Sequence, residues 1–471
     1  MQPDALNSPS PSGFYSSNIE ADGANFLGAS INDEASHGEA NSIRHGMPLS
    51  SLPRPRRPSS VSTIWQAQAS NNASDTRPMP INYLGHPSRA LDIFPSSSQR
   101  ALISHWVLHL SHKWMPIRTP TNPYLTVLSP IALEGSRMAN SNSSSTAALF
   151  HAVCAASATH QAVLRGDELE NNVLVLQHRR QSYFHLMRNM HRAEPSERLA
   201  SFGTLCLWIM TQFISGTPGT WREVVKVTRS LLEDTRIEMW TESTSASITY
   251  QSYAGFLALI QSRYVGYVEV PSPLAIDYAG HGFLQDQGLS SKLLSLISSF
   301  NTILLSGGAV DVGELDQLEM EFALSTPPVS DHTTTEAEEQ ASLRHQGFLF
   351  YHACLLYFKC VSGRRGSEAD IDALMAKCIQ LIERLDATNE DQNPSTWIYA
   401  TVAFEARTMN MRDRLRASIA RRVALGFETW NVLQSAAEEI WKSRDGAPTN
   451  TAPEPWPHML ARMPQFDLLL F

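Results

Sequence analysis

An almost unbroken helical spacing of apolar residues constrains this chain more than any other feature of its sequence. From Gln99 to the C-terminal end, apolar residues recur at the three- to four-residue spacing of an α-helix. The β-strand signal is limited to the short window Tyr264–Val270, which a proline ends. The pattern predicts an all-α fold, a large irregular helical bundle of about ten or more helices.

Prolines, glycines and polar stretches divide this region into expected helices. They are Ala101–Trp114, Thr146–Leu164, Leu174–Arg192, Leu199–Ile214, Trp221–Thr235, Ser252–Gly266, Leu289–Leu305, Val312–Ala323, Leu343–Val361, Glu368–Leu385, Ser395–Arg407 and Met411–Arg444. Thr146 or Ser145 is the expected N-cap of the second helix. Ser325–Ala341, with two prolines and an acidic-polar run, is the expected exposed loop.

Residues 1–98 have a different composition from the rest of the chain. Ser, Pro and Gly supply 19, 11 and 6 of these positions, whereas Leu, Ile, Val and Phe together supply 16. Burial of so few apolar side chains cannot offset the entropy lost when the backbone is ordered. We therefore predict a disordered Ser/Pro-rich tail over 1–98 and one helical domain over 99–471.

A short basic segment, Leu52–Pro58, lies within the predicted tail. Its three arginines, Arg54, Arg56 and Arg57, indicate a nuclear-import or phosphate-contacting segment. The alternative is an extended proline-rich linker with scattered charge.

Charge and cysteine content exclude several classes of protein. With 37 Lys+Arg and 46 Asp+Glu the net charge is −9, which argues against a broad surface that binds nucleic acid by neutralising phosphates. The five cysteines are never closer than six positions, so neither a disulfide framework nor a zinc-ligand spacing is present. We expect a reduced intracellular compartment, no signal peptide and no membrane span.

Neither the spacing of the histidines nor any motif in the sequence indicates an enzyme. His105, His109 and His112 are spaced to share one helix face, where they would be either metal ligands or ordinary structural histidines. The sequence has no nucleophile elbow, no phosphate-binding glycine loop and no aspartate cluster. Arg364 and Arg365, in a Gly-containing turn, could receive an anion or simply form a surface turn. We therefore predict no enzyme activity, no catalytic residue and no cofactor.

An arginine-rich run extends from Arg407 to Arg422. In it Arg407, Arg414 and Arg421 recur every seven residues, so on a helix they form one stripe. The stripe is either an anion- or DNA-facing ridge or a solvated face that pairs with acidic helices such as Glu314–Glu321.

The order of several motifs resembles the fungal-specific transcription factor domain, the helical regulatory body of fungal zinc-cluster regulators. The motifs are Leu102–Trp106 with Asn122-Pro123, the small-residue segment Ala147–Ala158, Tyr183–Met187, Leu205–Phe213, Ser215–Gly216 followed by Trp221-Arg222, His352–Phe358, Ile371–Leu385, Trp397–Ala406, the arginines at 412 and 414, Glu439–Trp441 and Trp456. The resemblance covers residues 99–460.

This resemblance implies a nuclear transcription regulator of metabolic or biosynthetic genes. We expect its partners to be other regulators or co-regulators, and homo- or heterodimers are compatible with this role. We expect no association with a membrane. Members of the family usually carry six closely spaced N-terminal cysteines that bind zinc, but no cysteine precedes Cys154 here. We therefore expect indirect DNA contact, through a partner or a missing zinc cluster, and zinc only if such a cluster exists. The alternative is a helical protein–protein scaffold outside transcription. Target genes, activation or repression, the effector and the oligomeric state stay open.

Overall fold

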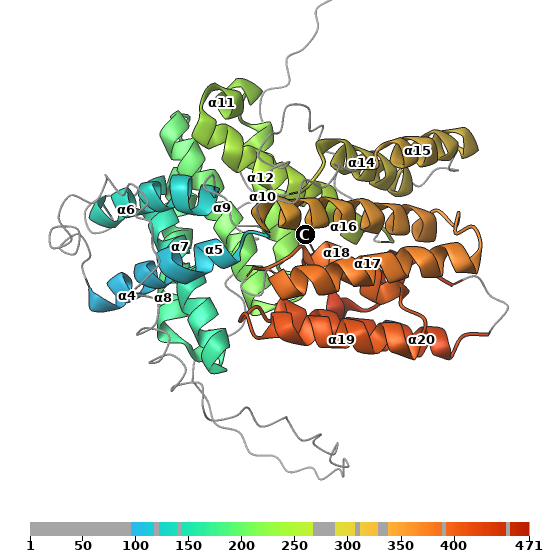
Figure 1. Ribbon diagram of the computed structural model, residues 1–471. Helices are drawn as coiled ribbons and strands as arrows, with labels where there is room; N and C mark the ends of the chain where they lie inside the picture. The colour runs from blue at the N-terminus through green and yellow to red at the C-terminus, as the bar shows by residue number, and fades with distance from the viewer. Residues whose placement is uncertain are drawn as a thin grey trace, which may run out of the picture. The chain divides into compact units, whose positions relative to one another are not determined.

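The computed structural model describes residues 96–116, 122–138, 144–266, 288–306, 311–327, 338–388, 392–448 and 453–470 (Figure 1). Helices dominate these ranges and no residue in them forms a strand, so the predicted all-α fold is confirmed. The predicted tail lies almost wholly outside the described residues, as do positions 267–270 of the strand window and the centre of the predicted loop.

The first half consists of helices and short helical turns as far as residue 264. They are α4 (Ser97–His105), the π-helical turn η2 (Trp106–Leu110), α5 (Ser111–Lys113), the π-helical turn η3 (Tyr124–Leu128), α6 (Ser129–Met138), α7 (Ser145–Arg165), η4 (Leu169–Asn171), α8 (Val173–Asn189), α9 (Pro195–Ser215), α10 (Trp221–Glu233), α11 (Ile237–Glu242), α12 (Thr244–Ile260) and η5 (Gln261–Tyr264).

The second half continues from residue 291. It comprises α14 (Ser291–Leu305), α15 (Val312–Leu324), α16 (Glu338–Val361), α17 (Glu368–Thr388), α18 (Thr396–Glu405), α19 (Met409–Val423), α20 (Thr429–Asp445), α21 (Trp456–Ala461) and η6 (Pro464–Phe466).

Helix α7 is the centre of the first half. Its alanine-rich sequence allows α6, α8 and α9 to pack closely against it. The Ser144 hydroxyl accepts a hydrogen bond from the Ala147 amide, so the N-cap is Ser144 and the predicted cap one or two residues later was wrong. Among the described helices α7 alone is long and apolar enough to cross a membrane, but 83% of its apolar window is buried against its neighbours. It is a core helix.

Helix α18 is the centre of the second half. Every one of its residues is buried. Helices α16, α17, α19 and α20 pack around it, and Figure 1 shows α17 between α16 and α19. A helix that is apolar on all faces is stable only when other helices enclose it, which explains its position.

The turn between α19 and α20 connects the two halves. The Glu428 amide donates to the Ile214 carbonyl at 2.9 Å, and the Thr429 hydroxyl donates to the Phe213 carbonyl at 2.6 Å. The rings of Phe213 and Phe427 pack with that of Trp114 at centroid distances of 5.2 to 6.1 Å. The end of α9 is thereby fixed to the start of α20.

This turn corrects the largest error of the sequence analysis, which expected one helix over Met411–Arg444. Two helices form instead, separated at Gly426, whose φ is +88°. A Cβ atom at Gly426 would lie 2.6 Å from Leu164 Cδ2 and 2.9 Å from His160 Nε2. The chain must therefore bend here and pass close to α7, and glycine permits both.

Other differences concern boundaries and short elements. Helix α12 begins eight residues before the expected Ser252, at the N-cap Ser243. Tyr264, the first residue of the strand window, lies in η5. Helices α6, α11 and α21 were not predicted, since two of them have six residues and α6 contains Pro130 in its first turn.

Candidate functional site

Helix α19 carries most of the arginine run, so the predicted ridge can be located directly. Arg414 and Arg421 lie on α19, and Arg407 lies in the turn before it. Each ridge arginine forms an ion pair with an acid on α17: Arg407 with Glu368, Arg414 with Glu383 and Arg421 with Asp386. The stripe therefore faces a row of carboxylates.

These three pairs differ in strength and exposure. Arg414 donates from Nε and Nη2 to the two oxygens of Glu383 at 2.8 and 2.7 Å, a bidentate arrangement that holds the pKa of Glu383 below its ordinary value. Arg421 is 61% exposed and its Nη1 lies 3.7 Å from Asp386 Oδ2. A phosphate that approached this ridge would have to compete with the carboxylates of α17.

The sequence analysis named the wrong acidic partner for this face. Acids of the segment 314–321 pair with bases elsewhere: Asp316 with Arg364, Glu319 with Arg364 and Lys359, and Glu321 with Lys292. The partner acids of α19 lie on α17 and α20, which are adjacent to it.

Two further arginines of α19 attach it to α20. Arg412 donates to both oxygens of Asp445 at 2.6 and 2.7 Å. Arg416 forms a bidentate pair with Glu438, and both guanidinium groups lie over the Trp441 ring at 5.4 and 4.9 Å. Helix α19 is thus bound by ion pairs on two sides.

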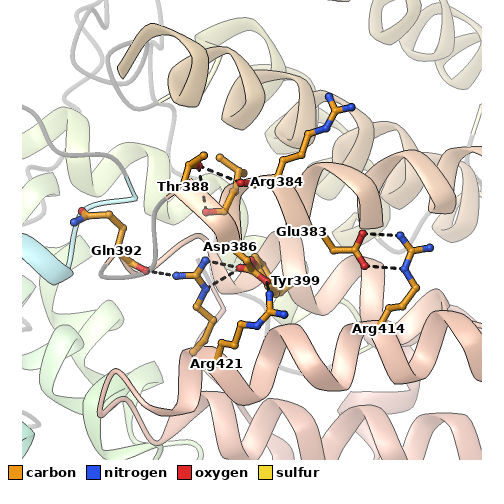
Figure 2. A network of polar contacts seen from close by, with 10 residues as sticks. Glu383, Arg384, Asp386, Thr388, Gln392, Tyr399, Arg414 and Arg421 are labelled. Carbon is orange, nitrogen blue, oxygen red and sulfur yellow. Dashed lines mark hydrogen bonds and ion pairs between the residues drawn. The ribbon is translucent and has the colours of Figure 1, made fainter. Parts of the chain in front are cut away.

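A buried ion pair of Asp386 and Arg422 adjoins the ridge, and Figure 2 shows Asp386 next to Tyr399. Asp386 and Arg422 are each 2% exposed, and Arg422 Nε donates to Asp386 Oδ1 at 3.0 Å. The Tyr399 hydroxyl donates to the same oxygen at 2.7 Å, and Arg422 Nη1 donates to the Gln392 carbonyl at 2.9 Å. Burial raises the pKa of Tyr399. The network joins α17, α18, α19 and residue 392.

A cavity of about 100 Å³ lies among α5, η3, α9 and α12. Its walls are largely apolar, with the aromatic residues Trp114, Tyr124, Tyr253 and Phe256 among the lining residues. The polar groups include the hydroxyls of Tyr124 and Ser252, 3.4 Å apart, and the amide of Asn393.

The Asn393 amide is one of the polar groups that line this cavity. Its Oδ1 accepts a hydrogen bond from Trp430 Nε1 at 2.8 Å, so its orientation is fixed. Its Nδ2 has no hydrogen-bond partner among the described residues, although the side chain is buried. The cavity could hold a compact apolar ligand with one acceptor atom.

The Gly…Trp step, which runs from Gly216 to Trp221 and is followed by Arg222, binds the C-terminal segment around Asp467. Arg222 donates from Nε and Nη2 to the two carboxylate oxygens of Asp467, both at 2.8 Å. The Trp221 indole and the Gly219 amide donate to the Asp467 carbonyl at 3.0 and 3.1 Å. The step fixes the chain's last residues onto α10.

The sequence matches the family model described as fungal specific transcription factor domain over residues 101–266 and 312–471. The chain belongs to this family. No curated protein and no solved structure matches it. The matched residues include both halves of the fold, the arginine helix and the Gly…Trp step. The resemblance inferred from motif order is confirmed, and transcription regulation, rather than catalysis, is the role of this family.

The cysteines of this fungal transcription factor domain do not fit the zinc cluster found in many regulators of its kind. All five are free thiols, four of them buried, and burial raises the pKa of every one. Zinc binds the thiolate form, which burial disfavours. Within the described ranges no three His, Cys, Asp or Glu side chains are placed to hold a metal.

The histidines of the domain form hydrogen-bonded pairs. His160 donates from Nε2 to the Leu425 carbonyl at 2.8 Å, so its Nδ1 accepts from His105 Nε2, also at 2.8 Å. A second pair joins His151 and His178 at 2.9 Å. Of the histidines at 105, 109 and 112, the first two have ring centroids 5.5 Å apart, and His105 bonds to His160 of α7.

The basic segment with Arg54, Arg56 and Arg57 lies outside the described residues, and its role in nuclear import stays a prediction. The sequence analysis missed the buried partners Asp386, Tyr399 and Arg422. Only weak signals in the sequence pointed to two of them. Asp386 is an acid three positions after Glu383, and Arg422 is the sixth arginine of the run, next to Arg421.

Proposed function

We propose that this chain is the regulatory body of a nuclear transcription regulator of metabolic or biosynthetic genes. The match of the family model to both helical halves carries this proposal. In our proposal the body reaches DNA through a DNA-binding partner or through an N-terminal zinc cluster, which its five cysteines do not supply. Partner regulators or co-regulators would bind its helices, and dimerisation is compatible with this mechanism.

The charge distribution supports indirect contact with DNA. The net charge is −9, and the arginines of the ridge are already paired with acids of α17. Proteins that bind DNA by phosphate neutralisation need basic side chains that are available to phosphates. Here those side chains bind carboxylates.

The test combines direct binding with tethering. At physiological salt, the purified chain should show no sequence preference among promoter fragments, and Arg421→Gln should not change this. Fused to an unrelated DNA-binding domain, it should alter the output of a reporter gene. Sequence-selective binding that Arg421→Gln weakens would overturn the partner mechanism and favour a DNA-facing ridge.

Localisation separates this function from the scaffold alternative. A tagged chain should accumulate in the nucleus, and replacing Arg54, Arg56 and Arg57 together by alanine should lower the nuclear fraction. Uniform cytoplasmic distribution with no effect on the tethered reporter would favour a helical scaffold outside transcription.

The cavity supports response to a small effector as a second element of this function. Its aromatic walls and the Asn393 amide suit a compact apolar ligand with an acceptor atom. Ser252→Phe would fill the cavity and should abolish any effector response of the tethered reporter. Ser435→Phe, on the exposed face of α20, is the matched control. An unchanged response in Ser252→Phe would exclude the cavity as the effector site.

A further inference from the structure

Two arginines, Arg365 and Arg444, bind the carboxylate of Glu405, and a third, Arg407, follows it by two positions in the chain. Arg365 lies in the turn between α16 and α17, Arg407 in the turn between α18 and α19, and Arg444 in the last turn of α20. Glu405 is fully buried. Its Oε2 accepts from Arg365 Nη2 at 3.0 Å and from Arg444 Nη1 at 3.3 Å, and its Oε1 accepts from Arg444 Nη2 at 3.0 Å.

Arg407 adds a third positive charge to this cluster. Arg407 follows Glu405 by two positions in the chain, and burial together with the charges of Arg365 and Arg444 lowers the pKa of Arg407. Arg407 pairs with Glu368, a side chain that is 66% exposed. The cluster therefore holds three guanidinium groups and two carboxylates, and one positive charge is not balanced within it.

Each of the three arginines also has a buried donor without an acceptor. Arg365 Nη1, Arg407 Nη2 and Arg444 Nε have no hydrogen-bond partner among the described residues. A buried charged donor without an acceptor is destabilising, so three of them around one surplus charge indicate a missing anion. By contrast, neighbouring Arg364 is paired with Asp316 and Glu319.

We propose that Arg365, Arg407 and Arg444 bind the phosphate group of a small phosphate monoester. Guanidinium groups suit this ligand because their planar N–H donors match phosphate oxygens in geometry and charge. The side chains of Arg365 and Arg444 are only 12% and 13% exposed, so the ligand must be small. It enters beside Arg407 and Glu368, the most exposed members of the cluster.

This assignment is independent of the proposed role in transcription. A phosphate bound here would connect the α16–α17 turn, the α18–α19 turn and the end of α20, of which the first and the last are otherwise joined through Glu405. It would share the Arg407 guanidinium with Glu368, which pairs with Nη1 of that group. The two anions would repel each other, so removal of the Glu368 carboxylate should strengthen binding.

Thermal unfolding of the purified full chain tests the site. Inorganic phosphate and glycerol phosphate should raise the Tm saturably above a potassium chloride control of equal ionic strength. Arg365→Gln and Arg407→Gln should abolish the rise, whereas Arg421→Gln, on α19 but outside the cluster, should retain it. Glu368→Gln should lower the apparent Kd about two- to fivefold, the size of one exposed ion pair.

The result with Glu368→Gln distinguishes a binding site from a structural cluster, because a variant that only weakens the fold cannot bind phosphate more tightly. An unchanged or higher Kd in Glu368→Gln, or a Tm rise that survives Arg407→Gln, would overturn the proposal. Tighter binding of a phosphoserine peptide than of glycerol phosphate would overturn the assignment to a small molecule.

Discussion

At the scale of single residues, the arginines of α19 bind acids of the neighbouring helices and so hold the domain together. Arg414 binds Glu383 at the surface of α17, whereas Arg422 binds Asp386 in the interior, which the exposed Arg421 approaches from outside. Exposed and buried ion pairs thus lie side by side on one helix. The exposed pairs are screened by water, but the buried pair leaves an isolated charge if one partner is removed.

Removing the buried carboxylate should therefore cost far more stability than removing an exposed one. We expect Asp386→Ala to lower the free energy of unfolding by about 3–5 kcal/mol, because Arg422 would stay buried without its carboxylate partner. Glu383→Gln, the matched control on the same helix, should cost about 1 kcal/mol or less. Urea unfolding measures both, and equal losses would contradict the distinction.

At the scale of elements, local sequence sets a helix end where a capping side chain is present. Where no capping side chain is present, tertiary contacts set the helix end. Asn172 and Ser290 each accept a hydrogen bond from the first turn of their helix, close to the starts that the sequence predicted at Leu174 and Leu289. The break between α19 and α20 has no such signal except one glycine. It exists because α7 lies against Gly426.

Two glycines with similar backbone angles allow this to be tested. Gly426 (φ +88°) faces Leu164 and His160, whereas Gly363 (φ +77°) has no atom within 4 Å of an added Cβ. Gly363→Ala should cost about 1–2 kcal/mol from the left-handed conformation alone. Gly426→Ala should cost about 2–5 kcal/mol, since crowding against α7 adds to that strain. Urea unfolding measures both losses, and if they were equal the contact with α7 would not shape the break.

At the scale of the whole molecule, α7 joins distant segments through buried imidazoles. His160 bonds to α4 and to the turn after α19, while His151 bonds to α8. Burial lowers the pKa of His105 and His178 to about 4 and that of His151 and His160 to about 3. These histidines are neutral in the folded protein, and the unfolded chain takes up protons first.

The domain should therefore lose stability in mild acid. Since the folded pKa values lie below the ordinary 6.5, the contribution of these histidines is complete above pH 6.5 and falls as the pH falls from 6.5 to about 4. We expect a loss of about 1 kcal/mol per buried imidazole between pH 7.5 and 5.5. Urea unfolding at both values measures it. His160→Gln keeps a donor for Leu425 and should reduce the loss, and an equal loss in this variant would exclude His160 as a source.

The sequence by itself determined the all-α class, most helices and the family, because helical periodicity, caps and motif order are local properties. It also placed Arg407, Arg414 and Arg421 on one stripe. It did not determine which acids the stripe faces. The segments 314–321 and 368–386 both carry acidic side chains, and only the packing of the helices decides which of these lie near the arginines. The cluster around Glu405, the cavity beside Asn393 and the break at Gly426 depend likewise on contacts between residues far apart in the chain. Only the tertiary structure decided them.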